Sequence, residues 1–161
     1  SNGLKRQTQN HLRRLLCGSV RYTITVPPDH DFDDAIGTCQ CSWCRKVTGS
    51  LMFRFHQFKK VDVAWDADST LRTYQAEPDN HRGFCCNCGS YMFFRREKSK
   101  LINLAVGCFD DDDLRKYGPL LTKEGATCGA GTRFLASRIT LRARNMTRSL
   151  RIEAAASWAL G

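Results

Sequence analysis

Apolar and polar side chains alternate strictly over residues 19–26. One face of this segment is made of Val20, Tyr22, Ile24 and Val26. The residues between them are serine, arginine and threonine, which suit a solvent-facing side. Because successive side chains of a strand point to opposite sides, this period of two predicts a strand with one buried face. The two prolines that follow predict its end.

Strand patterns recur along most of the chain, whereas helix signals are scarce. Hydrophobic, β-branched and aromatic residues predict further strands over residues 51–58, 61–65, 70–74, 91–95 and 101–108. The exception is the segment 110–118, where four aspartates precede Leu114 and a glycine stands at the end. Acidic residues suit the start of a helix and glycine suits its end, so this segment predicts a helix of one or two turns. The expected fold class is mainly β, with few short helices.

Three thiols lie within six residues of one another, at Cys39, Cys41 and Cys44. They cannot all pair as disulfides, and they are close enough to share one metal ion. The two-residue gap between Cys41 and Cys44 is typical of a zinc knuckle, whose tight turn directs both sulfurs to one point. Three sulfurs leave one tetrahedral position. A structural site closes that position with a fourth protein ligand, whereas a catalytic site leaves it to water or substrate.

A second knuckle, formed by Cys85, Cys86 and Cys88, occurs later in the chain, and Gly89 suits its turn. Two knuckles together strongly predict zinc, but their spacing leaves two pairings open. In the first, a single ribbon-type site is formed by Cys41, Cys44, Cys85 and Cys88. In the second, the first group of thiols holds one ion, and the second knuckle holds another together with the region of Cys17.

The positive charge of the chain is concentrated at its two ends. The chain has 25 basic and 16 acidic residues and a formal net charge of +9, yet its middle is balanced. We therefore divide it into a basic N-terminal segment (1–14), a zinc-binding domain (15–125) and a basic tail (126–161). The balanced middle argues against a uniformly basic face that binds nucleic acid. The basic ends are expected to be disordered or of doubtful structure.

The spacing of the nine cysteines indicates the kind of compartment. Six of them lie in the two tight groups, which is metal-binding spacing and not the spacing of a disulfide framework. We therefore expect a reducing compartment, the cytoplasm first, with the nucleus or an organelle as alternatives. No apolar run reaches the roughly 18 residues that cross a bilayer, so no membrane span is expected.

Three motifs in a fixed order carry a resemblance to a known family. They are Cys17-Gly18-Ser19-Val20-Arg21-Tyr22, then Cys39 to Lys46 followed by Thr48-Gly49-Ser50, then Arg82-Gly83-Phe84-Cys85 and Cys88-Gly89-Ser90. Over residues 15–122 the chain resembles the glutathione-dependent formaldehyde-activating enzyme family, which includes centromere protein V. The segments at both ends do not resemble the family.

The resemblance implies a fold and a set of metal ligands. It implies a tent-like arrangement of small antiparallel sheets pinned by zinc. It also implies the second pairing, with a catalytic ion at Cys39, Cys41 and Cys44 and a structural ion at Cys17, Cys85 and Cys88. The family has a further cysteine where this chain has Leu15, so the structural site is expected to be incomplete.

The function implied is that of a zinc-dependent carbon–sulfur lyase acting on an adduct of glutathione, or a similar thiol, with an aldehyde. Zinc bound by three thiolates suits this chemistry because it holds an incoming thiol in the deprotonated state. Arg21, Arg45 and Lys46 are candidates for binding the carboxylates of the thiol. The alternative is a non-catalytic, zinc-stabilised module that binds nucleic acid or a protein partner, and the sequence does not predict the oligomeric state.

The remaining chemistry-bearing residues are expected to have ordinary roles. The histidines have no spaced partner, and packing or surface positions are expected for His11, His30, His56 and His81. Cys86 is expected to point away from the knuckle as a free thiol, and Cys108 to be a small buried hydrophobic residue. Cys128 lies in the basic tail and is assigned no role.

Overall fold

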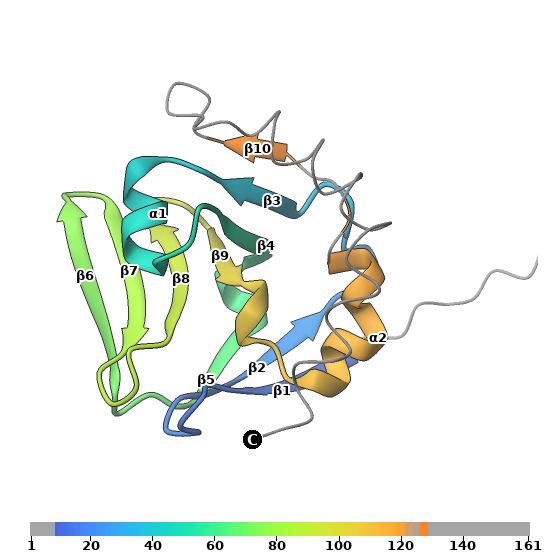
Figure 1. Cartoon of the computed structure of the whole chain (residues 1–161). Coiled ribbons are helices and arrows are strands. Elements are labelled where there is room, and N and C mark those ends of the chain that lie inside the picture. The colour runs from blue at the N-terminus through green and yellow to red at the C-terminus, as the bar shows by residue number, and fades with distance from the viewer. Residues whose placement is uncertain (1–8, 122, 124–125, 129–161) are drawn as a thin grey trace, which may run out of the picture.

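The computed structural model describes residues 9–121, 123 and 126–128, and its strands form two sheets (Figure 1). The smaller sheet has three antiparallel strands in the order β1-β2-β5. Their bounds are β1 Gln9–Arg14, β2 Arg21–Val26 and β5 Val63–Ala67. The larger sheet has seven strands in the order β10-β3-β4-β9-β8-β7-β6. Its bounds are β3 Ile36–Cys39, β4 Phe53–Lys59, β6 Leu71–Glu77, β7 Asn80–Cys85, β8 Tyr91–Arg96, β9 Leu101–Ala105 and β10 Ala126–Cys128.

Helical structure is limited, and the predicted mainly β fold is confirmed. The α-helices are α1 Ser42–Thr48 and α2 Asp111–Leu121, and two 3₁₀ turns are η1 Lys60–Asp62 and η2 Val106–Cys108. Every strand pair is antiparallel except β10 with β3, which is parallel. No helix in the described ranges is long and apolar enough to cross a membrane.

The alternating segment near the start of the chain forms β2, as predicted. Val20, Tyr22 and Ile24 are each 0% exposed, so its apolar face lies in the core. Trp65 of β5 links the two sheets, because its ring lies 5.4 Å from that of Tyr22 and 5.7 Å from that of Phe93 in β8. Burial of large side chains of this kind contributes about 1.5–3 kcal/mol each.

The helix α2 is longer than the one or two turns that the sequence predicts. It continues past Gly118 and includes Pro119. The cause is tertiary, because Leu114, Tyr117 and the buried Leu121 all pack against the main core. Their spacing of three and four residues places them on one helical face, and this packing outweighs the low helix propensity of glycine and proline.

Both basic end segments contribute a strand, which the sequence did not predict. β1 pairs with β2 from Gln9 opposite Val26 to Arg14 opposite Arg21, so part of the segment expected to be disordered is ordered. β10 pairs with β3, so the tail begins with regular structure. Both strands lie at the edge of a sheet, where backbone hydrogen bonds to a neighbouring strand hold a segment of weak strand propensity. The rest of the tail, 129–161, lies outside the described residues.

A pair of histidines lies inside an aromatic cluster. His56 of β4 is 0% exposed, and its Nε2 lies 2.8 Å from Nε2 of His30. The His30 ring stacks on that of Phe58 at 5.1 Å, and Phe32 lies against both histidines. Burial, and then the neighbouring His30, lower the pKa of His56 to about 4. His56 is therefore a packing residue, as predicted, and it is neutral in the folded protein.

We expect the fold to lose stability as pH falls from 6.5 towards 4. Over this window an unfolded His56 takes up a proton while the folded one stays neutral, so the unfolded state gains protons and is favoured. The shift corresponds to about 3 kcal/mol when it is fully expressed. His56→Phe should flatten the pH dependence of the melting temperature relative to the wild type. Both proteins keep every cysteine, so any metal that is released at low pH is released from both. If the melting temperatures of the two proteins fall in parallel as the pH is lowered, the prediction is contradicted.

Candidate metal centre

The first group of cysteines lies at the junction of β3 and α1. Cys39 is the last residue of β3, Cys41 is the N-cap of α1, and Cys44 lies in its first turn. The sequence predicted a tight turn here, but the chain forms a helix, because the Cys41 sulfur accepts a hydrogen bond from the Cys44 backbone N–H at 3.4 Å. Gly49 ends this helix with φ of 65°, which confirms the backbone bend expected there.

The three sulfurs of this group, the Cys39–Cys41–Cys44 triad, lie within 4.8 Å of one another. Burial, followed by the two neighbouring cysteines, raises the pKa of Cys44, and burial also raises the pKa of Cys39. Burial acts against ionisation of Cys41 too, but backbone N–H groups at the start of α1 and the adjacent sulfurs outweigh it and lower its pKa. Three thiolates this close repel one another, and a divalent cation removes that repulsion. The donor set fits zinc.

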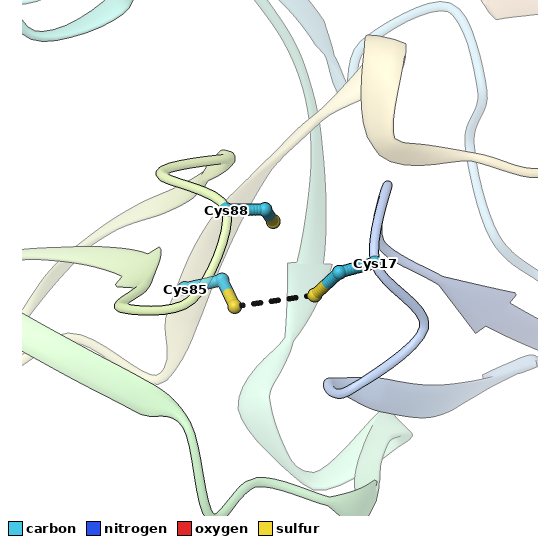
Figure 2. Close-up of side chains that lie close together, drawn as sticks. All are labelled: Cys17, Cys85 and Cys88. Carbon is cyan, nitrogen blue, oxygen red and sulfur yellow. Dashed lines mark hydrogen bonds between the residues drawn. The ribbon is translucent and has the colours of Figure 1, made fainter.

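The second group, the Cys17–Cys85–Cys88 triad, joins two distant parts of the chain (Figure 2). Cys17 lies between β1 and β2, whereas Cys85 ends β7 and Cys88 follows in the next turn. The sulfurs of Cys17 and Cys85 are 3.7 Å apart, and all three lie within 4.8 Å. The hydroxyl of Ser90 lies 3.3 Å from the Cys88 sulfur and lowers the pKa of Cys88 to about 6. This donor set also fits zinc.

The geometry decides between the two pairings that the sequence left open. The six cysteines predicted as ligands separate into the two triads, and in the described part of the chain Cys41 and Cys44 form no group with Cys85 and Cys88. The single ribbon-type site is therefore wrong. The reason is that Cys39 and Cys85 end β3 and β7, which are separated in the larger sheet by β4, β9 and β8. Packing of the smaller sheet against the core of the larger one brings Cys17 to the second knuckle.

A cavity of about 390 Å³ opens beside the Cys39–Cys41–Cys44 triad. Aromatic side chains, three arginines and two side-chain amides form much of its wall. Besides the three cysteines, the lining includes Phe53, Phe55, Gln57, Arg82, Phe94, Arg95, Arg96, Asn103 and Cys128. An open position on an ion held by the triad would therefore be reachable by a small molecule.

Two arginines of this wall have unsatisfied hydrogen-bonding groups. Arg82 is only 6% exposed, and its guanidinium lies 5.2 Å from the Trp43 ring and 5.3 Å from the Phe94 ring. The Nε atoms of Arg82 and Arg95 are buried and have no hydrogen-bond partner among the described residues. A buried unpaired donor is costly, so these groups favour an anionic ligand.

The sequence did not indicate that these arginines bind a ligand. The candidates from the sequence, Arg21, Arg45 and Lys46, are not among the residues lining the cavity. The available signal was the position of Arg82 three residues before Cys85. Because side chains alternate along β7, Arg82 points to the opposite face from His81 and Gly83. Only the fold shows that this face is the one at the Cys39–Cys41–Cys44 triad.

Comparison with known proteins identifies the family. A family model described as glutathione-dependent formaldehyde-activating enzyme matches residues 13–122. The chain belongs to this family. A crystal structure of a Rhodobacter sphaeroides protein is similar in fold, with a TM-score of 0.55 and 21% identity over 72% of this chain and 98% of that chain. No match was found among curated proteins.

Leu15 is the residue of this member of the glutathione-dependent formaldehyde-activating enzyme family at which a further cysteine was expected from the resemblance. Leu15 is 4% exposed and belongs to the same core cluster as Cys85. A second cavity, of about 790 Å³, is lined by Leu15, Cys17, Ser90 and Cys108 among others. In the described residues no fourth sulfur joins the Cys17–Cys85–Cys88 triad.

The nearby cysteines do not complete that triad. Cys86 is exposed, as predicted, and its thiol donates to the Asn87 side-chain oxygen at 3.9 Å. Cys108 lies in η2 and is partly buried, and its thiol donates to the Tyr91 carbonyl oxygen at 3.1 Å. The side chain of His11 lies outside the described residues.

Proposed function

We propose that this protein is a zinc-dependent carbon–sulfur lyase-type enzyme that acts on adducts of glutathione, or a similar thiol, with formaldehyde or a similar aldehyde. The observation that carries the proposal is the Cys39–Cys41–Cys44 triad, which opens into a cavity with unpaired arginine donors. Membership of the family supports the thiol and the aldehyde as substrates.

The residues of the cavity suit each part of such an adduct. Zinc held by Cys39, Cys41 and Cys44 would keep a thiol deprotonated near neutral pH, ready to bond to a carbonyl carbon. Glutathione carries two carboxylates, and Arg82 and Arg95 line the cavity and offer guanidinium donors for them. Since Arg82 is fixed between two aromatic rings, it loses little side-chain entropy on binding.

The polar amides and the aromatic wall suit the aldehyde end. The Gln57 amide donates to the Asn103 side-chain oxygen at 2.9 Å, which fixes both side chains at the cavity. Each amide has a further group with which to orient the hydroxyl of the adduct. Phe53 and Phe55, whose rings lie 5.5 Å apart, reduce the access of water to the reacting carbon.

The proposal is tested with zinc-loaded protein, glutathione and formaldehyde. Proton NMR exchange measurements should show faster interconversion of free aldehyde and adduct than in buffer alone. Equal rates with and without protein, across several thiols and aldehydes, would contradict the lyase proposal and leave the zinc-stabilised binding module as the better account. That module predicts binding to DNA that weakens steeply with salt.

We further propose a reducing compartment, the cytoplasm first, as the place of action. All nine cysteines are unpaired, and six of them lie in the triads. Thiolate ligands and a thiol substrate both need conditions that prevent disulfide formation. A cell fractionation experiment that finds the protein in an oxidising compartment would contradict this.

Replacing Arg82 by alanine should raise KM for glutathione about tenfold to a hundredfold. This is the effect of losing one or two charge-assisted hydrogen bonds of about 1.5–3 kcal/mol. Arg82→Lys should give an intermediate KM, because lysine keeps the charge and loses the planar fork. Arg21→Ala is the matched control, since Arg21 is exposed on the smaller sheet. An unchanged KM in both Arg82 variants would exclude the arginine as a carboxylate site.

A further inference from the structure

Cys128 lies beside the Cys39–Cys41–Cys44 triad, although it is distant in the sequence. In the parallel pairing of β10 with β3 it is the partner of Cys39, and its carbonyl oxygen accepts a hydrogen bond from the Gln40 backbone N–H at 3.3 Å. Adjacent strands lie about 4.8 Å apart, and paired residues direct their side chains to the same face of the sheet. Cys128 accordingly lines the same cavity as the triad.

The backbone leading to Cys128 is anchored to the body of the domain. Arg54 of β4 donates to the carbonyl oxygens of Leu121 and Lys123. The Lys123 ammonium lies 2.7 Å from an Asp33 carboxylate oxygen. These contacts hold Leu121 and Lys123, which precede β10, against the body of the domain, and the pairing with β3 places Cys128. β10 lies beyond the residues that match the family model, 13–122.

The thiol of Cys128 is adjacent to the triad but is not part of it. Cys128 is exposed and unpaired, and its sulfur is not one of the three that lie within 4.8 Å of each other. A side chain moves between staggered rotamers at low cost, and cysteine has a single such torsion before its sulfur. A tethered thiol also has a high effective concentration at the neighbouring site.

We propose that Cys128 is an internal fourth thiolate ligand, which closes the metal centre at Cys39, Cys41 and Cys44 until a substrate thiol replaces it. Four cysteines complete the tetrahedral set that zinc prefers, whereas three leave one position open. The proposal rests on the proposed function, because it assumes an ion at the triad. It deepens that function by assigning a regulatory residue that the family match does not include.

The exchange balances without any further reagent. The bond between Cys128 Sγ and the ion breaks, and the bond between the incoming thiol sulfur and the ion forms. The proton released by the incoming thiol is taken up by the Cys128 thiolate, so the charge at the centre is unchanged. No atom is oxidised or reduced. The equilibrium therefore depends on the concentration of the substrate thiol.

The test uses the full chain loaded with ¹¹³Cd, with thiols kept reduced by a phosphine. The ¹¹³Cd chemical shift reports the number of sulfur ligands, and the resonance that Cys17→Ser removes is assigned to the Cys17–Cys85–Cys88 triad. In the wild type, the resonance of the Cys39–Cys41–Cys44 site should be that of four sulfurs. In Cys128→Ser it should move to the three-sulfur position, and added glutathione should return it. Cys86→Ser is the matched control, since it removes an exposed thiol outside this cavity.

A glutathione titration gives the second measurement. If Cys128 closes the centre in about nine molecules of ten, the apparent affinity for the thiol is lowered about tenfold. Cys128→Ser should then bind glutathione about tenfold more tightly, and Cys86→Ser should match the wild type. If the resonance of the Cys39–Cys41–Cys44 site is that of three sulfurs in the wild type and Cys128→Ser leaves it unchanged, the role of Cys128 is overturned and the lyase proposal stays intact. Absence of a sulfur-ligated resonance from this triad in every variant overturns both.

Discussion

Replacing Cys44 by serine should empty the Cys39–Cys41–Cys44 centre and lower turnover of the thiol–aldehyde adduct on the order of a thousandfold. Changes to residues that merely support metal ligands already cost about 10–100-fold, and loss of a ligand itself should cost more. Cys44 is 6% exposed and lies in the first turn of α1, so the substitution removes the most buried of the three sulfurs. Zinc analysis should show one equivalent fewer per chain.

Two controls distinguish metal loss from unfolding in this experiment. Cys86→Ser should keep both the zinc content and the turnover of the wild type, because Cys86 is exposed and outside both triads. Circular dichroism of Cys44→Ser should keep the β-sheet signal, because the second triad and the main core are untouched. Full turnover by Cys44→Ser would contradict the assignment of the active centre.

Leu15→Cys should raise both the zinc content and the melting temperature, whereas Cys85→Ser should lower both. Binding energy at a structural zinc site is also folding energy, on the order of 10 kcal/mol for a complete site at neutral pH. Leu15 lies in the same core cluster as Cys85 and lines the cavity next to Cys17, so a sulfur at this position is placed to complete the triad. Cys85 is 0% exposed and Thr70 lies 3.4 Å from its sulfur, so its loss disturbs the core as well as the metal.

The matched control for this substitution is Leu15→Ala. It removes the apolar contacts of Leu15 without adding a sulfur, and should destabilise the fold by about 2–5 kcal/mol. Zinc content and melting temperature are measured together, by metal analysis and by thermal denaturation with and without a chelator. If Leu15→Cys melts as low as Leu15→Ala and binds no more zinc, position 15 does not reach the ion.

Local patterns in the sequence predicted much of the fold because strands and knuckles are encoded over short distances. The alternation around Tyr22 and Ile24 specified β2 and its buried face, since the period of two belongs to any half-buried strand. The extent of α2 was not predictable in this way. Its last turn depends on the packing of Leu121 against a core whose other members come from distant strands.

The edge strands β1 and β10 were also not predictable from the local sequence. Neither β1 nor the three-residue β10 has the alternation that predicts a strand, and both are held by the backbone of a neighbouring strand. Cys128 was therefore assigned no role from the sequence, although its pairing with Cys39 places it at the cavity. Its position follows from a parallel pairing between segments at opposite ends of the domain.

By itself the sequence determined which side chains are available for metal chemistry: two tight groups of cysteines in a β-rich, charge-balanced domain. Only the tertiary structure decided how those cysteines combine. Packing of the smaller sheet against the larger one brings Cys17 to Cys85 and Cys88, and the pairing of β7 with β8 places Arg82 at the cavity beside the other triad. The physical reason is that periodicity specifies which face of a strand is buried, whereas the neighbours of each strand depend on non-local pairing and core packing.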